Sequence, residues 1–317
     1  MTTHTRRGVL RNSPVDLVGL TWSALCVVWM YGSALLYPRM GLLGCVSALG
    51  VQLILLSISI MTEHHATHTP IFFQPVLNRA CQFLFSVAHG RPSSAYSRGH
   101  LFHHQETISY SSFPRHESLP IWSLKSLVRS VLRAYLNSFR VVELGLVIKA
   151  LRHSLPARER ARPFAHFGDY LGALLERLLL VVGKHRRLGR RILTEALVVC
   201  ASRVALCALN YKFFFLVWVP LDFLDGLVAS YTEFCTHYGA PADSRGRDAV
   251  SSYGRFFNLV WLNLGYHQEH HFRPGTHWSR LPEVREALPP ENERRVVPRS
   301  IWTNVFVPLR DSARGTV

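Results

Sequence analysis

The sequence predicts an all-α integral membrane protein with four transmembrane helices in two hairpins, interfacial helices and a cytoplasmic cap rich in histidine. Three observations favour this fold class. Of the residues, 48% are hydrophobic and only 18% are charged, and four long apolar stretches lie in two pairs along the chain. There are also 17 histidines, more than an average chain of this length carries. This composition argues against a disordered chain and against an ordinary soluble enzyme.

Residues 15–37 and 40–61 form the first predicted hairpin. The first stretch has one charge, Asp16 at its start, and the second has none. At about 1.5 Å rise per residue, 20 or so helical residues cross a hydrocarbon layer of roughly 30 Å. Pro38 and Arg39 leave room for only a tight turn between the two. A second apolar stretch directly after the first argues against a cleaved signal sequence.

Residues 192–209 and 213–231 form the second predicted hairpin, with residues 210–212 at its turn. Charged residues lie inside both stretches, so this pair is less apolar than the first. A charge inside a membrane helix is costly unless it is paired or faces the protein interior. Arg203 and Asp222 lie at similar distances from the turn, and we expect them to pair.

Two further segments lie between the hairpins. Residues 71–88 are apolar but interrupted by polar residues and proline, which favours a re-entrant or surface-lying element. Residues 120–150 have apolar and basic side chains on neighbouring helical stripes, as in an interfacial amphipathic helix; a surface helix of a soluble cap is the alternative. The predicted organisation is a cytoplasmic tail over 1–14, one membrane domain over 15–285 and a cytoplasmic tail over 286–317.

The basic residues predict the orientation. The two short turns contain only Arg39 and Lys212, Arg203 lies inside a span, and the other basic residues lie on the opposite side. By the positive-inside rule that side is cytoplasmic, and both termini lie there. The basic residues behind the formal net charge of +16 therefore flank apolar spans and do not line an aromatic groove, which argues against a nucleic-acid partner.

Eight histidines fall into three boxes with the spacing of metal ligands. In the first box the spacing is HxxxH, and in the second and third it is HxxHH: His64 and His68; His100, His103 and His104; His267, His270 and His271. If the second span continues as a helix, positions i and i+4 place two imidazoles on one face. His65 then points elsewhere, as an outer or solvent-facing residue, and its pairing with His68 is the competing register. The predicted spans bring all three boxes to the same side of the membrane.

The number of imidazoles predicts two metal ions. A structural zinc site closes with four ligands and a catalytic one keeps three plus a water, so eight are too many for one ion. Imidazole suits iron, copper, zinc and nickel, so ligand type alone does not choose the metal. The six cysteines form no CxxC pair, which argues against a zinc ribbon and against a disulfide framework.

The order of the boxes resembles the membrane fatty acid desaturase and hydroxylase superfamily. The most specific part is residues 263–274, NLGYHQEHHFRP, which run on to Trp278 and to Leu281-Pro282. The resemblance covers roughly residues 15–285. It implies four spans and a cytoplasmic di-iron centre held by histidines. It also implies the use of O2 and two electrons to desaturate or hydroxylate an unactivated carbon.

The resemblance draws attention to a fourth element just after the last span. His237, within His-Tyr-Gly, matches an additional histidine of the family, whereas Glu233 stands where the family usually has Asn. Glu233 would either ligate iron, directly or through water, or accept a hydrogen bond from a ligand histidine without contacting the iron. The predicted ligands of the two iron ions are therefore His64, His68, His100, His103, His104, His237, His267, His270 and His271, with Glu233 as a further candidate.

Acidic neighbours complete the predicted site. Glu63, Glu106 and Glu269 adjoin ligand candidates and are predicted to accept from imidazole N–H groups, which need an acceptor to fix their tautomer; simple exposure to solvent is the alternative for each. No catalytic residue is expected beyond the metal ligands. Most other histidines, at positions 4, 65, 89, 116, 153, 166, 185 and 277, are expected to be solvated or interfacial.

The resemblance leads to an O2-dependent desaturase of a fatty acyl chain, as acyl-lipid or acyl-thioester, whose substrate lies in a tunnel between the spans and the cap. Hydroxylation of an alkyl or terpenoid chain is the alternative on the same scaffold. The chain has no HPGG haem-binding segment and no GxGxxG, so an external donor, such as a ferredoxin, rubredoxin or cytochrome b5-like protein, is implied. Two alternatives belong to other classes. A membrane metal transporter is disfavoured because its ligands would lie inside the spans, and a membrane zinc hydrolase is disfavoured because it needs fewer histidine ligands.

Overall fold

The structure is a computed structural model of the chain and describes residues 9–106, 186–241 and 244–307. The interfacial helix predicted at residues 120–150 lies outside these ranges. The described chain forms two compact units. The first unit comprises residues 9–102 and 186–225, and the second comprises residues 103–106 and the described residues from 226 onwards.

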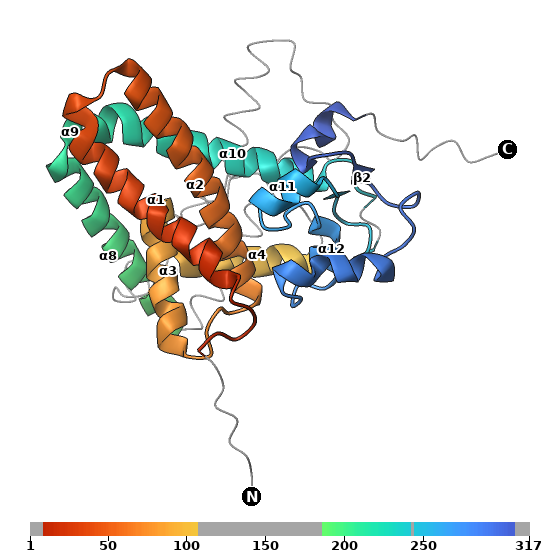
Figure 1. Cartoon of the computed structure of the whole chain (residues 1–317). Helices are drawn as coiled ribbons and strands as arrows, with labels where there is room; N and C mark the ends of the chain where they lie inside the picture. The colour runs from red at the N-terminus through yellow and green to blue at the C-terminus, as the bar shows by residue number, and fades with distance from the viewer. Residues whose placement is uncertain (1–8, 107–185, 242–243, 308–317) are drawn as a thin grey trace, which may run out of the picture. The chain divides into compact units, whose positions relative to one another are not determined.

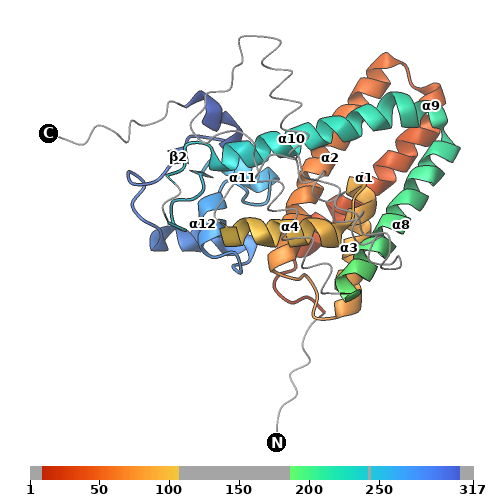
Figure 2. The same ribbon diagram turned by 180° about the vertical axis from the view of Figure 1, so that it is seen from behind.

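The first unit is a group of long helices. Helices α1 (Asp16–Leu36) and α2 (Leu42–His68) are joined by the short 3-10 turn η1 (Tyr37–Arg39). They lie side by side, and α3 (Pro75–His89) and α8 (Arg186–Leu209) pack beside α1 (Figures 1 and 2). Their contacts enclose an apolar core that includes Cys26, Met30, Leu55, Leu56, Leu206 and Trp218. For helices that cross a membrane, close packing of such side chains, rather than their removal from water, is what holds the helices together.

The turn after α8 is fixed by one asparagine. Asn210 Oδ1 accepts from Phe213 N (3.0 Å), and its Nδ2 donates to Ala34 O at the end of α1 (3.1 Å). The chain continues through α9 (Tyr211–Phe213), a π-helical turn η3 (Phe214–Trp218) and α10 (Val219–His237). Asn210 thus caps the new helix and ties it to the first one.

Four helices in the described part of the chain are long and apolar enough to cross a membrane. They correspond to the spans predicted from the sequence, and their bounds are Asp16–Arg39, Leu42–His68, Arg186–Leu209 and Tyr211–His237. Each is longer than predicted, the last three by more than a helical turn. The second continues to the first histidine box and the fourth to His237. The pairing into membrane hairpins, the sides of the membrane and the division into two tails and one membrane domain stay predictions.

The segment predicted to be re-entrant or surface-lying forms helix α3, which is not among the candidate spans. Asn78 fixes the turn before it, since its Oδ1 accepts from Phe72 N (3.0 Å) and its Nδ2 donates to Phe72 O (2.8 Å). Cys81 and Phe85 are buried in the unit. Arg79 forms an ion pair with Glu195 of α8, whose side chain is fully buried. The break in hydropathy at Arg79 is therefore the mark of a helix-to-helix ion pair.

Arg203 of α8 faces the interior of the first unit. Its guanidinium donates to Val87 O (3.0 Å) and to Met30 Sδ (3.3 Å) and lies 4.7 Å from the centre of the Trp218 ring. A carbonyl oxygen and an aromatic face both stabilise a cation away from water. The predicted pair with Asp222 stays a prediction.

The second unit consists of short elements. These are α11 (Arg255–Val260), α12 (His267–Phe272), the 3-10 helices η4 (Trp278–Ala287) and η5 (Ile301–Phe306), and the parallel strands β1 (Ser251–Ser252) and β2 (Val296–Val297). Helix α4 (Ser93–Glu106) begins in the first unit and ends in this one, and α10 does the same.

Residues after 287 are packed into the second unit. Asn304 Nδ2 donates to Cys235 O (2.7 Å) and to Tyr238 O (2.8 Å), and Tyr231 OH donates to Trp302 O (2.7 Å). The two bonds from Asn304 satisfy carbonyl groups in the last turn of α10 and just after it, which lack partners within the helix. The segment that follows η4 therefore stabilises the end of the helix that carries His237.

Candidate metal centre

The first cluster lies in the first unit and consists of His64, His68 and His100. Helix α2 supplies the first two at i and i+4, and α4 supplies the third. The donor nitrogens lie within 4.8 Å of one another. The ring centroids of His64 and His100 are 4.2 Å apart, and those of His68 and His100 are 4.9 Å apart. Tyr96 stacks on the His100 ring one turn earlier along α4.

Two buried carboxylates hold the helices of the first cluster. Glu63, next to His64, accepts from Arg91 Nη2 (2.7 Å) just before α4 begins. Glu195 accepts from Ser94 N and Ser94 Oγ, both at 2.7 Å, in the first turn of α4. A carboxylate is favourable at a helix N-terminus because the N–H groups there have no partners within the helix. The carboxylates of Glu63 and Glu195 thus fix the positions of α2 and α4, which carry the imidazoles.

The second cluster lies in the second unit and consists of His103, His237, His267 and His271. Their donor nitrogens also lie within 4.8 Å of one another, and all four side chains are buried. The Nε2 atoms of His103 and His271 are 3.2 Å apart, and those of His237 and His267 are 3.4 Å apart. The Nε2 atoms therefore converge on one point.

Three of the four rings in the second cluster have their opposite nitrogen facing an oxygen atom. His237 Nδ1 donates to Asp248 O (2.9 Å), and His271 Nδ1 lies 3.3 Å from Asp248 Oδ2. His103 Nδ1 lies 3.6 Å from Glu233 Oε1. A proton held on Nδ1 leaves the lone pair of Nε2 for a metal ion, and this outer contact fixes the tautomer and the direction of the ring.

The charge state of His271 suits a metal ligand. Burial lowers the pKa of His271 well below its usual value, and the neighbouring His267, His104, His237 and His103 lower it further. The imidazole is therefore neutral at neutral pH, which is the form that binds a metal ion. Three imidazoles in one cluster and four in the other also match the donor numbers of protein metal sites. The residues present thus fit a bound metal in each cluster.

The remaining predicted ligands are placed as follows. His104 and His270 lie in the second unit beside the second cluster. The His104 ring is 4.4 Å from that of His271 and 4.6 Å from that of His270. Glu233 Oε1 lies 3.9 Å from His237 Nε2. The structure brings nine histidines into or beside the two clusters, but their assignment as ligands stays a prediction.

Three histidines differ from the expectation of solvated or interfacial positions. His65 is buried and lies outside the clusters, since His68 meets His64. His89 is buried and its Nε2 is 3.1 Å from Ser59 Oγ, while His277 Nδ1 is 2.8 Å from Ser279 Oγ. Each polar ring is accommodated by the fold rather than by water. The histidines at 4, 116, 153, 166 and 185 lie outside the described residues.

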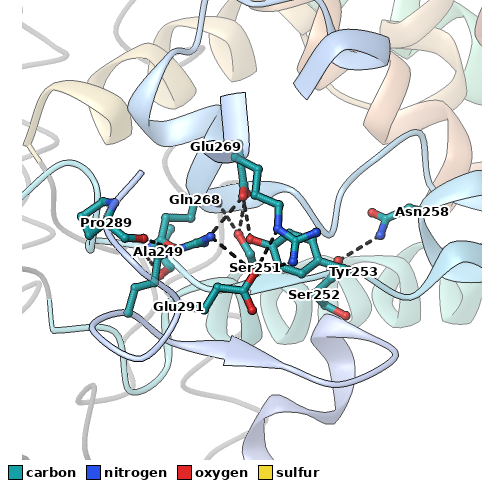
Figure 3. A network of polar contacts seen from close by, with 11 residues as sticks. Ala249, Ser251, Ser252, Tyr253, Asn258, Gln268, Glu269, Pro289 and Glu291 are labelled. Atoms are coloured by element: carbon teal, nitrogen blue, oxygen red, sulfur yellow. Dashed lines mark hydrogen bonds and ion pairs between the residues drawn. The ribbon is translucent and has the colours of Figure 1, made fainter. Parts of the chain in front are cut away.

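The predicted imidazole partners Glu63 and Glu269 bind other groups. Glu63 pairs with Arg91, as described above. Glu269 accepts from Ser251 Oγ (2.6 Å) and from Tyr253 OH (2.7 Å), as Figure 3 shows. The prediction was wrong for both, because the helical period turns a residue next to a ligand away from the metal side. The Glu106 side chain lies outside the described part.

Asp248 is the residue that sequence reasoning missed. Both its backbone oxygen and its carboxylate meet imidazoles of the second cluster. It lies in a loop between the fourth span and the third box, at no regular spacing from a histidine. The available signal was weak: a carboxylate between two boxes, in a region that has to pack against them.

Comparisons with known proteins agree with this geometry. The sequence profile of the fatty acid desaturase family matches residues 37–302. The sphingolipid delta(4)-desaturase DES1 of Drosophila melanogaster is 33% identical over 100 residues, which cover 29% of this chain and 30% of that relative. The chain thus spans about a third of the length of this curated relative. No solved structure matches. The resemblance seen in the histidine boxes is confirmed by the profile match.

Proposed function

Because the chain belongs to the fatty acid desaturase family, we propose that this oxidoreductase is an O2-dependent di-iron membrane enzyme that desaturates a fatty acyl chain. The acyl chain is carried as an acyl-lipid or an acyl-thioester. The observation that carries the proposal is the pair of imidazole clusters, one in each unit, of which the second is fully buried. In the second cluster the Nε2 atoms converge while the Nδ1 atoms of His103, His237 and His271 face oxygen, an arrangement typical of metal ligands rather than of histidines that only fill space.

The proposed ligands are the histidines of the sequence prediction. His64, His68 and His100 hold one ion, and His103, His237, His267 and His271 hold the other. His104 and His270 are the further ligand candidates. Glu233 takes the outer role at His103 Nδ1, since its carboxylate faces that nitrogen at 3.6 Å. This role needs no direct bond between Glu233 and iron.

The two iron ions, when bound, supply the redox chemistry for reducing O2 and removing hydrogen from unactivated carbon. In desaturation, two C–H bonds of a CH2–CH2 unit break and one C=C bond forms. O2 takes up these two hydrogens together with two electrons and two protons, and leaves as two waters. Asp248 orients the His237 and His271 rings, and the buried cluster excludes water from them.

The two electrons come from an external donor in this proposal, such as a ferredoxin, a rubredoxin or a cytochrome b5-like protein. The excess of basic residues would attract an acidic donor to the cytoplasmic face. The substrate is a lipid that lies within the bilayer, and both termini and the histidines lie on the cytoplasmic side.

The proposal is tested with purified protein in a membrane mimetic. Iron and zinc content, O2 consumption with a reductant system, and the lipid products of expressing cells are measured together. Iron, O2 uptake coupled to substrate, and a new double bond are expected. Zinc alone with no O2 dependence would contradict the proposal. An alcohol product in place of an alkene would select the hydroxylase alternative.

A further inference from the structure

The third histidine box lies on a very short helix, α12, which covers only His267–Phe272. Isolated helices of this length are unstable in water, because nucleation fixes several residues for one hydrogen bond. Its direction therefore depends on contacts made by its other face. That face carries Gln268 and Glu269, the two residues between the histidines of the box.

Glu269 is fully buried and surrounded by donors. Ser251 Oγ donates to Oε2 and Tyr253 OH donates to Oε1 (Figure 3). Burial raises the pKa of Tyr253, and the charge on Glu269 raises it further, so the phenol stays protonated and able to donate. A buried carboxylate also needs a counter-charge, because two neutral hydroxyls do not offset the loss of its hydration.

Arg294 supplies that counter-charge from a segment 25 positions after Glu269 in the sequence. Its Nη1 lies 3.5 Å from Glu269 Oε1 and donates to Gln268 Oε1 (2.8 Å). Its Nε donates to Pro289 O (2.9 Å), and its side chain is only 1% exposed. One buried guanidinium thus binds both residues that lie between the histidines of the third box.

The residues around this guanidinium are themselves fixed. Gln268 Nε2 donates to Ala249 O (3.1 Å), and Gln268 N donates to Ser251 Oγ (3.2 Å). Ala249 follows Asp248, which holds the His237 and His271 rings. The network in Figure 3 therefore links the back of α12 to the loop that orients two imidazoles of the second cluster.

We propose that Arg294 is a positioning residue of the metal centre, which holds α12 through Glu269 and Gln268 so that the His267 and His271 donors stay aligned. This inference rests on the proposed metal-binding function of the second cluster. Arg294 touches neither metal nor substrate. Its effect is on the geometry of the ligand helix, and such outer contacts typically change metal affinity or activity by about 10-fold to 100-fold.

The test compares Arg294→Gln with Arg294→Lys in the full-length protein. We measure the iron dissociation constant, iron per chain, kcat and KM, and the thermal unfolding of the protein. Arg294→Gln is expected to weaken iron binding about 10-fold or more and to lower kcat, with KM little changed. Arg294→Lys keeps the charge but not the fork of donors, so it is expected to be intermediate.

The matched control is Arg280→Gln. Arg280 pairs with Glu283 in the same unit, but both side chains are largely exposed. It should leave iron affinity and kcat as in the wild type. If Arg294→Gln fails to fold, the iron affinity of Arg294→Lys decides, and wild-type affinity in that folded variant overturns the proposal. Wild-type iron affinity in folded Arg294→Gln overturns it as well.

His271→Ala, measured in parallel, separates this inference from the proposed function. If His271→Ala keeps the full iron content, the metal assignment itself is wrong. If His271→Ala loses iron while both Arg294 variants bind it like the wild type, the proposed function stands and only the role of Arg294 is overturned.

Discussion

The two histidine clusters are held in different ways. In the first unit, His64 and His68 lie at the end of α2, a helix of 27 residues, and the nearby carboxylates of Glu63 and Glu195 bind Arg91 and the first turn of α4. In the second unit, α12 has six residues, and Asp248 touches two of the rings directly. A long helix fixes its side chains by its regular geometry, whereas a short one relies on local polar contacts.

The difference predicts where each cluster is vulnerable. The first should be sensitive to changes that shift whole helices and so lower the stability of the unit. The second should be sensitive to changes of single polar partners, which lower metal affinity before stability. The substitutions below test this contrast, from the largest expected effect to the smallest.

Replacing one ligand in each cluster should have the largest effect, and the two effects should be equal. His64→Ala and His103→Ala each remove an imidazole donor, and activity requires both ions. We expect no detectable product from either variant in a lipid-product assay of expressing cells, at wild-type protein levels. Activity retained by one of the two would show that its cluster is not part of the site.

Asp248→Asn should show the difference between the clusters, because it changes a polar partner of the second cluster alone. It keeps the backbone oxygen that accepts from His237 but changes the carboxylate next to His271. We expect iron affinity to fall about 10-fold to 100-fold, as is typical for outer partners of ligand histidines. The matched change is Glu63→Gln, whose carboxylate binds Arg91 and no imidazole. An equal or larger loss of iron affinity in Glu63→Gln would contradict the contrast.

Glu195→Gln should lower stability in the first unit. It removes a buried charge that binds Arg79 and caps α4 through Ser94. Breaking a buried pair from one side typically costs about 3 kcal/mol or more, and less where the remaining charge reaches water. Because Arg79 is 22% exposed, we expect about 2 kcal/mol, seen as a lower unfolding temperature in detergent. An unchanged unfolding temperature would remove this pair from the account.

The smallest effect is expected for Glu283→Gln. Its partner Arg280 is exposed, and exposed ion pairs of this kind contribute little to stability because water screens them. The pKa of Glu283 is lowered, mainly by the hydrogen bond from Arg280. Any stabilisation from this pair is thus lost as the pH falls through that pKa. Unfolding at neutral pH should be close to wild type, and a marked loss would show that exposed charges matter in this unit.

The spans and the histidine boxes could be predicted because their signals are local. Apolar length identifies a span, and the helical period places His64 beside His68 whatever the rest of the chain does. Helix α2 continues to His68, seven residues beyond the end of the predicted apolar span at residue 61. His237 was found only through the resemblance to a family.

The outer contacts could not be predicted, because they depend on how distant segments pack. Arg294 is one of 36 basic residues and lies in a stretch predicted to be a tail. Asp248 has no fixed spacing from any histidine. Glu269 adjoins the third box and was expected to bind an imidazole, but it points to the other side of α12, where Ser251 and Tyr253 meet it.

The central claim is that each cluster holds one iron ion. The most direct measurement is iron per chain by elemental analysis of wild type, His64→Ala and His271→Ala, each purified in the same membrane mimetic. We expect about two irons in the wild type and about one in each variant, since each substitution opens one site of three or four imidazoles. Unchanged iron in both variants, or zinc in place of iron, would contradict the claim.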